Sequence, residues 1–255
     1  MTEPTITLSV VSHGHGALVR DLLSSIEQHC GAALEVIVTR NIPEAPLHWE
    51  SDAFPVRVID NRCPQGFGAN HNAAFQQSLG KYFCVINPDI RITHDPFPAL
   101  IDALNQNPSA GVAGPRVETP CGKLEDSARR FPTPWSILLK LLGRNKDRQL
   151  LGEKLYQSPV TVDWIAGMFM LFPREVFEQL GGFDERYFLY YEDVDLCSRL
   201  HRNNRRVLVV PNAAVIHDAR RESHRNLKFL RWHLASMMRF FIRHNLGKLL
   251  GTSSP

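Results

Sequence analysis

The chain has 255 residues and a mass of 28.9 kDa, which fits one large α/β domain better than two separate domains. Hydrophobic residues make up 44% and charged residues 22%, values of a globular protein that exclude a disordered or fibrous chain. The net charge of +3 is unevenly spread. Residues 220–248 hold eight Lys or Arg and one acid, about +7, and the remaining 21 basic and 25 acidic residues give about −4.

The five cysteines are widely spaced and form no CxxC pair, which argues against a disulfide framework or a structural zinc site. The N-terminus lacks the basic and apolar regions of a signal peptide. The longest apolar run, residues 165–172, is far shorter than the roughly 20 residues of a membrane-spanning helix. We therefore expect a cytoplasmic protein whose only membrane contact would be peripheral, at the inner face.

Short apolar runs alternate with helical patterns over the first 115 residues. We expect strands at residues 6–11, 34–39, 56–59 and 82–86, and helices at residues 18–26 and from 66 to about 79. This alternation predicts a Rossmann-like α/β domain with a mostly parallel sheet flanked by helices. Ligands bind beyond the carboxyl ends of such strands, where we expect Ser12, Asn41, Asn61 and Asp89.

The second half of the chain is less regular. Residues 116–160 are rich in loops, with one expected helix at residues 136–142. They include Arg129 and Arg130, which would either bind phosphate groups or lie solvated in a loop. We expect further helices at residues 174–180, 193–203 and 226–245, and a strand at residues 207–210.

Asn87, Pro88 and Asp89 follow the apolar strand at residues 82–86, in a turn that proline makes rigid. A carboxylate at this place suits a divalent cation, because magnesium takes one or two carboxylates and completes its shell with substrate phosphates. The alternative is a turn in which Asp89 only accepts hydrogen bonds from nearby amides.

Glu192, Asp193 and Asp195 lie at the start of an expected helix, after the largely aromatic run at residues 187–191. Crowded carboxylates beside aromatic rings can have raised pKa values, which suits a general base. Acids also favour the first turn of a helix through its dipole, so capping is the alternative.

His217 ends an apolar stretch, and its neighbour Asp218 could orient the imidazole ring. A single histidine in this setting is more often structural than a ligand, so the pattern leaves both roles open. Gly66, Phe67 and Gly68 lack the spacing of a dinucleotide fingerprint and carry little information alone.

Taken together over residues 5–220, these motifs resemble glycosyltransferase family 2, whose members are inverting enzymes of the GT-A fold. Within it the chain is most similar to bacterial rhamnosyltransferases of cell-surface polysaccharide synthesis. The matching stretches are residues 12–14, 61 with 66–72, 87–89, 181–185, 192–196 and 217. One position departs: Arg40 stands where the family usually has an Asp that contacts the nucleobase, so thymidine and uridine are not distinguished.

The resemblance implies a role for each motif. Asp89 and His217 would bind Mg²⁺ or Mn²⁺ at the donor diphosphate, and Asp193 would be the catalytic base, supported by Glu192 and Asp195. The donor contacts would be Ser12, Asn41, Gly66, Phe67, Asn70, Asn72, Asn87 and Asp89. The acceptor-side residues would be Trp164, Gly167 and Glu192.

The implied reaction is metal-dependent inverting transfer of a sugar, rhamnose from dTDP-rhamnose, to a hydroxyl of a glycan or a polyprenyl-diphosphate-linked glycan. One alternative is a UDP-sugar donor carrying galactofuranose, N-acetylglucosamine or glucose. Another is a non-catalytic scaffold that binds nucleotide sugars. Residues 1–220 would form the GT-A domain, with a nucleotide-sugar half at 1–115 and an acceptor half at 116–220, and residues 221–255 a basic helical extension.

In that extension, large apolar residues recur every three or four positions with arginines between them: Leu227, Leu230, Leu234, Met238 and Phe241. This pattern predicts an amphipathic basic helix suited to an anionic membrane surface. The alternatives are packing on the body of the protein and pairing with a second copy in a homodimer. Nucleic acid is not an expected partner, because no recognition motif accompanies the charge.

Overall fold

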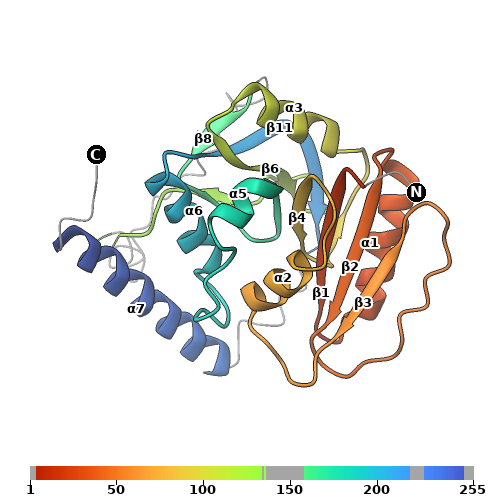
Figure 1. Ribbon diagram of the computed structural model, residues 1–255, viewed down its shortest axis with the longest axis horizontal. Coiled ribbons are helices and arrows are strands. Elements are labelled where there is room, and N and C mark those ends of the chain that lie inside the picture. The colour runs from red at the N-terminus through yellow and green to blue at the C-terminus, as the bar shows by residue number, and fades with distance from the viewer. Residues whose placement is uncertain (1–3, 134, 136–157, 219–226, 250–255) are drawn as a thin grey trace.

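A mixed β-sheet forms the middle of the protein, and helices cover both of its faces (Figure 1). The structure is a computed structural model that describes residues 4–133, 135, 158–218 and 227–249. The helix expected at residues 136–142 lies outside these ranges. Within them, the main sheet has the strand order β3-β2-β1-β4-β10-β6-β11-β5, and β8 also pairs with β11.

The first four strands match the expected bounds to within one residue. They are β1 (Ile6–Ser12), β2 (Leu34–Arg40), β3 (Val56–Asp60) and β4 (Tyr82–Ile86). They pair in parallel, β3 with β2, β2 with β1 and β1 with β4. In β4, Cys84 and Ile86 pack into one hydrophobic core and Phe83 and Val85 into the other. Burial on both faces explains why this strand is apolar at nearly every position.

The remaining strands extend the sheet beyond β4. They are β5 (Ile90–Arg91), β6 (Ala110–Glu118), β8 (Val160–Val162), β10 (Phe169–Pro173) and β11 (Arg206–His217). Strands β6 and β11 run in the direction of β1, whereas β10, β5 and β8 run the opposite way. Most of the sheet is therefore parallel, as predicted. A small separate sheet pairs β7 (Ala128–Arg129) with β9 (Trp164–Ile165).

The helices divide between the two faces of the sheet. Helices α1 (Gly16–His29) and α3 (Phe97–Gln106) contribute to one core. The other core contains side chains of α2 (Phe67–Phe75), α5 (Arg174–Gln179) and α6 (Glu192–Arg202). Helix α2 is shorter than expected, because the chain turns after Phe75, where Ser78 Oγ donates a hydrogen bond to the Phe75 carbonyl.

The expected C-terminal helix is present as α7 (Leu227–Leu249), which lies beside the loop that leads into α6 (Figure 1). Ser236 and Phe240 are buried against the body. Four other side chains of α7, spaced four residues apart, are exposed: Leu230, Leu234, Met238 and Ile242. In the described parts of the chain, no helix combines the length and the apolar character needed to cross a membrane.

Candidate functional site

A network of side-chain amides lies at the carboxyl ends of β2 and β3. Asn41 accepts hydrogen bonds through Oδ1 from the Asn61 amide (2.9 Å) and the Gln65 backbone N–H (2.7 Å). The Asn61 amide also donates to Asn70 Oδ1 (2.6 Å), and the Asn70 amide donates to the Gly66 carbonyl (3.0 Å). These amides therefore fix the loop that precedes α2, and they place Asn41, Asn61 and Asn70 together at the predicted sheet edge.

Ser12 and Arg40 lie at the same edge, at the ends of β1 and β2. Ser12 Oγ donates to Glu44 Oε2 (2.9 Å) and accepts from the His15 backbone N–H (3.1 Å). Arg40 forms a bidentate ion pair with Asp60 on β3, with Nε–Oδ1 at 2.5 Å and Nη2–Oδ2 at 2.6 Å. The cation that departs from the family pattern is thus paired with a carboxylate of the adjacent strand.

Asp89, His217 and Glu125 form a hydrogen-bonded chain, called here the Asp89 cluster. His217 Nε2 lies 3.2 Å from Asp89 Oδ2, and His217 Nδ1 lies 2.7 Å from Glu125 Oε2. The backbone supports the first contact, because His217 pairs with Ile90 across β11 and β5. Glu125 therefore orients the imidazole ring, and the suggested partner Asp218 instead donates its backbone N–H to the Asp89 carbonyl (3.0 Å).

Charge in the Asp89 cluster favours a protonated histidine. Burial alone would lower the pKa of His217, but hydrogen bonds and charge from Asp89, and then from Glu125, raise that pKa to about 9. A metal ion bound at Nε2 must therefore displace a proton at neutral pH.

The donor atoms of this cluster fit a divalent cation. Asp89 Oδ1 is buried and has no hydrogen-bond partner in the described part of the chain, as an oxygen reserved for a ligand would be. Carboxylate and imidazole are ligands that Mg²⁺ or Mn²⁺ accepts together with phosphate oxygens. Glu125 contacts the opposite nitrogen of the ring, and among the residues described no three His, Cys, Asp or Glu side chains converge in a way that could hold a metal ion by themselves.

Glu192, Asp193 and Gly167 form a second group, called here the Asp193 cluster. Asp193 is half-buried, and its carboxylate accepts hydrogen bonds from the backbone N–H groups of Gly167 (2.9 Å) and Val194 (2.8 Å). Burial raises the pKa of Asp193, and these hydrogen bonds oppose the rise. A carboxylate held in this way is oriented and more basic than one in water, as a general base requires.

Glu192 lies beside Asp193 and is 5% exposed. Burial, and next the charge of Asp193, raise the pKa of Glu192 well above its ordinary value. Its Oε2 is buried without a hydrogen-bond partner in the residues that the structure describes. Burial thus disfavours the charged form of Glu192, whereas two backbone N–H groups stabilise the charged form of Asp193.

Gly167 brings the predicted donor and acceptor sides together. A Cβ atom at Gly167 would lie 3.2 Å from Phe67 Cε1 and 3.7 Å from Asp193 Cβ. Phe67 itself donates its backbone N–H to the Phe188 carbonyl (2.9 Å). The start of α2, the loop before β10 and the first turn of α6 thus meet at one place.

Trp164 and Asn87 have supporting contacts. Trp164 is 9% exposed, its Nε1 donates to the Arg130 carbonyl (2.9 Å), and the Arg129 guanidinium lies 5.4 Å from its ring centroid. Asn87 donates its backbone N–H to the Met168 carbonyl (2.9 Å), which joins the end of β4 to the start of β10.

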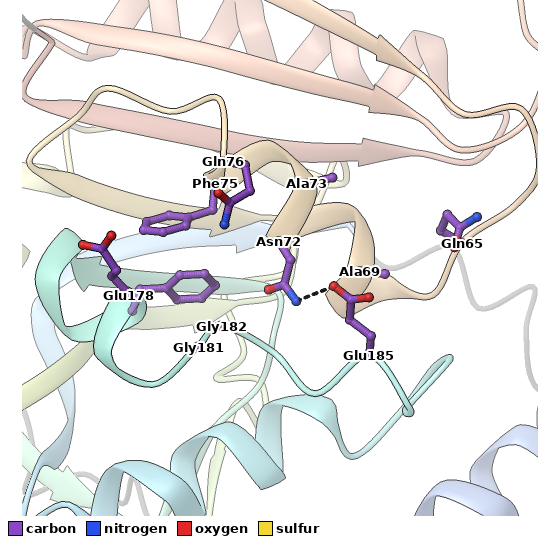
Figure 2. A pocket seen from close by; sticks show the side chains of 11 residues that line it. Gln65, Ala69, Asn72, Ala73, Phe75, Gln76, Glu178, Gly181, Gly182 and Glu185 are labelled. Carbon is purple, nitrogen blue, oxygen red and sulfur yellow. Dashed lines mark hydrogen bonds between the residues drawn. The ribbon is translucent and has the colours of Figure 1, made fainter.

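Asn72 lies apart from these clusters, in the wall of a pocket of about 450 Å³ between α2 and the loop after α5 (Figure 2). Its amide donates to Glu185 Oε1 (3.0 Å) and to the Phe183 carbonyl (2.9 Å). The pocket is lined by Gln65, Ala69, Asn72, Ala73, Phe75, Gln76, Phe177, Glu178, Gly181, Gly182 and Glu185. Asn72 thereby joins α2 to the glycine-rich loop, and the Asp89 and Asp193 clusters do not line this pocket.

Comparison with known proteins shows the family of this chain. Residues 10–181 match the family described as Glycosyl transferase family 2. The chain belongs to this family. It is 30% identical to Rhamnosyltransferase WbbL of Escherichia coli K12 over 94% of both chains. It is 34% identical to the N-acetylglucosaminyl-diphospho-decaprenol L-rhamnosyltransferase of Mycobacterium tuberculosis H37Rv, over 85% of this chain and 76% of that protein.

Solved structures establish the fold of this family 2 member. GalNAc-T7 with UDP, GalNAc and Mn²⁺ superposes with a TM-score of 0.66 at 15% identity. The mannosyltransferase PcManGT of Pyrobaculum calidifontis, with GDP-Man and Mn²⁺, superposes with a TM-score of 0.62 at 16% identity. The alignments cover 87% and 95% of this chain but only 45% and 65% of those chains. The predicted GT-A fold and the prediction of a glycosyltransferase are both confirmed.

Proposed function

We propose that the protein transfers rhamnose from dTDP-rhamnose to a hydroxyl of a polyprenyl-diphosphate-linked glycan, with inversion at the anomeric carbon. The observation that carries this proposal is the similarity, over most of the chain, to two proteins named as rhamnosyltransferases, one of them by a decaprenol-linked substrate. Residues 1–115 would supply most donor contacts and residues 116–220 most acceptor contacts. The chemistry would take place between the Asp89 and Asp193 clusters.

Asp193 is the base in this proposal. It accepts the proton of the acceptor hydroxyl while that oxygen attacks the anomeric carbon from the face opposite the leaving diphosphate. The new C–O bond forms as the bond to the diphosphate oxygen breaks, so the configuration inverts without a covalent intermediate. The N–H groups of Gly167 and Val194 keep the carboxylate oriented, and its raised pKa strengthens it as a base.

Asp89 and His217 would hold Mg²⁺ or Mn²⁺ beside the donor diphosphate. Bound there, the ion supplies neutralisation of the negative charge on the leaving nucleoside diphosphate. Glu125 keeps the His217 ring in place through Nδ1, so that Nε2 faces Asp89. The buried Oδ1 of Asp89 supports this assignment.

The C-terminal helix α7 would attach the enzyme to the membrane that carries its acceptor. Its exposed apolar residues Leu230, Leu234, Met238 and Ile242 are 47–63% exposed. The helix contains Lys and Arg but no acid, which suits anionic lipid headgroups. A second copy of the chain is the competing partner for this surface, and sedimentation with and without anionic vesicles distinguishes the two.

A donor panel tests the proposed reaction. The protein would be incubated with Mg²⁺ or Mn²⁺, a polyprenyl-diphosphate-linked GlcNAc acceptor and one donor at a time: dTDP-rhamnose, UDP-galactofuranose, UDP-GlcNAc or UDP-glucose. We expect transfer from dTDP-rhamnose alone, with an inverted linkage by NMR. Transfer from a UDP-sugar instead would contradict the donor assignment. Tight donor binding without transfer to any acceptor would contradict catalysis and favour a scaffold protein.

A further inference from the structure

Helix α7 contacts every residue of the run at 187–191, which leads directly into α6 and Asp193. The Arg239 guanidinium lies 6.0 Å from the ring centroid of Tyr187, and the Trp232 ring stacks on Phe188 with 4.5 Å between centroids. The Leu189 carbonyl accepts from Ser236 Oγ (2.9 Å). Tyr190 and Tyr191 pack on the His233 ring (5.3 and 5.5 Å between centroids), and Tyr191 also on Phe240 (5.6 Å). The inner face of α7 is thus fitted to this run.

The run has a backbone conformation that needs such support. Tyr190 and Tyr191 have φ values of 70° and 67°, in the left-handed region that side chains disfavour. Residues in this region persist where surrounding contacts determine the backbone, often at functional sites. The start of α2 also packs closely against the run, because a Cβ atom added at Gly66 would lie only 2.9 Å from Phe188 Cα. The run is therefore held between the start of α2 and α7.

One cation of α7 joins both ends of the run. Arg243 Nη1 lies 2.5 Å from Asp184 Oδ2, three residues before the run, and 3.3 Å from Asp195 Oδ1, in the first turn of α6. Asp195 is 1% exposed, and its other oxygen pairs with Arg199 Nε (2.8 Å). Loss of Arg243 would leave Asp195 Oδ1 without its cation while Arg199 keeps Oδ2, and a buried carboxylate oxygen that loses its partner is costly at the turn that carries Asp193.

We propose that Arg243 is a positioning residue, which joins Asp184 and Asp195 across the 187–191 run and thereby keeps the first turn of α6, with Asp193, at Gly167. This rests on the proposed function, because it takes Asp193 as the base. Helix α7 then has two separate tasks on its two faces. The inner face sets the geometry of the Asp193 cluster, and the exposed face would meet the membrane.

The inference predicts a change in the transfer step and not in donor binding. Asp89 lies in the turn before β5 and His217 at the end of β11, and within the residues that the structure describes Arg243 forms its ion pairs with Asp184 and Asp195 instead. We expect Arg243→Gln to lower kcat about tenfold, because a small misplacement of a reacting group costs up to about 100-fold. The donor KM should stay within about twofold of wild type. Arg243→Lys, which keeps the charge, should recover most of kcat.

The experiment uses the full chain, dTDP-rhamnose, metal and a soluble acceptor analogue without lipid, so that membrane attachment does not enter. The matched control is Arg231→Gln, an exposed arginine of the same helix, which should behave as wild type. Amide hydrogen exchange is measured in parallel, and we expect residues 188–195 to exchange faster in Arg243→Gln. Donor binding by calorimetry shows that the variant retains a folded donor site.

Two results would overturn the inference: a kcat of Arg243→Gln equal to that of Arg231→Gln, or a loss of donor affinity as large as the loss of kcat. The second would mean that Arg243 only stabilises the fold. If the wild-type chain transfers no sugar from any donor, the proposed function fails, and the exchange experiment still decides on its own. Unchanged exchange at residues 188–195 would then refute the role of Arg243.

Discussion

Asp89 immediately precedes β5 and His217 ends β11, two paired strands of one sheet, whereas Asp193 lies in the first turn of a helix that follows two residues in the left-handed region. Backbone pairing between β5 and β11 holds the first pair side by side. The Asp193 cluster depends instead on the contacts that α2 makes with Phe188 and α7 makes with Asp195. The Asp89 cluster should therefore tolerate distant changes better than the Asp193 cluster.

The two clusters also differ in charge. In the Asp89 cluster a histidine lies between two carboxylates, and its pKa is raised to about 9 because the protonated ring is paired on both sides. In the Asp193 cluster two acids lie side by side under burial, and both pKa values are raised because the charged forms are disfavoured. In the proposed function, the first cluster would exchange a proton for a metal ion and the second would accept a proton from the acceptor hydroxyl.

The largest expected effect follows from replacing the base. Asp193→Asn should lower kcat by roughly 10³-fold, because general-base catalysis contributes 10²–10⁴-fold, while donor affinity stays close to wild type. Steady-state kinetics and donor titration check both parts. Asp218→Asn, an exposed acid near the Asp89 cluster, serves as the control. A variant with more than a tenth of wild-type kcat would show that Asp193 is not the base.

Replacing Asp89, the proposed metal ligand, should weaken both donor binding and sugar transfer. We expect Asp89→Asn to lower kcat/KM about 100-fold, because it weakens the stabilisation of charge on the leaving diphosphate. Chelation with EDTA should abolish transfer by the wild type, and added Mn²⁺ should restore it. Isothermal titration with donor and metal together would show weaker binding in Asp89→Asn. Equal activity with EDTA and with Mn²⁺ would refute metal dependence for this chain.

The hydrogen bond from His217 to Glu125 predicts a pH dependence. Since the pKa of His217 is about 9 and metal binds the neutral ring, apparent metal affinity should rise from pH 6 toward pH 9 and level off above it. Glu125→Gln removes one paired carboxylate, so the pKa of His217 falls and the affinity should level off at a lower pH. The affinity on that plateau should be about tenfold lower than in wild type, because the ring loses the partner that orients it. Calorimetry in buffers of different ionisation enthalpy measures the protons released. Asp126→Asn, the neighbouring acid, which pairs with Arg129, is the control. Proton release that is the same in wild type and Glu125→Gln contradicts this account.

The sequence alone is sufficient for the first four strands of the sheet. Strands β1 to β4 follow their expected bounds closely, and in β4 burial on both faces requires apolar residues at nearly every position. Strand β11 is longer than expected, because its register shifts between Val210 and Ala214, around Pro211, and the strand continues to His217. Helix α3 is not among the expected elements, although Phe97, Leu100 and Leu104 have helical spacing.

Glu125 and Arg243 could not be found in the same way. Glu125 lies 92 residues from His217 and carries no local pattern, since a loop acid is ordinarily solvated. Arg243 falls in a helix whose apolar residues occupy two faces, one on the body and one exposed, so spacing alone does not say which arginine turns inward. Both contacts are set by tertiary packing, which a single sequence does not reveal.

The smallest expected effect compares the stability of the two regions. A hydrogen bond from the Arg186 side chain, and to a smaller extent the charge of Arg243, lower the pKa of Asp184 from its ordinary 3.8 to about 2. Because the folded pKa is depressed, this carboxylate stabilises the fold above pH 4 and loses that contribution as pH falls toward 2. Asp184→Asn should therefore lower the free energy of unfolding by about 1–2 kcal/mol at pH 7 and by progressively less at pH 4 and pH 3. Denaturant unfolding at each pH measures this change in the free energy of unfolding.

The control is Asp60→Asn, in the exposed ion pair with Arg40 on the donor side. It should lower the free energy of unfolding less, because solvent screens that pair. A larger loss in Asp60→Asn would show that ion pairs at the sheet edge, and not those joining α6 to α7, stabilise the site.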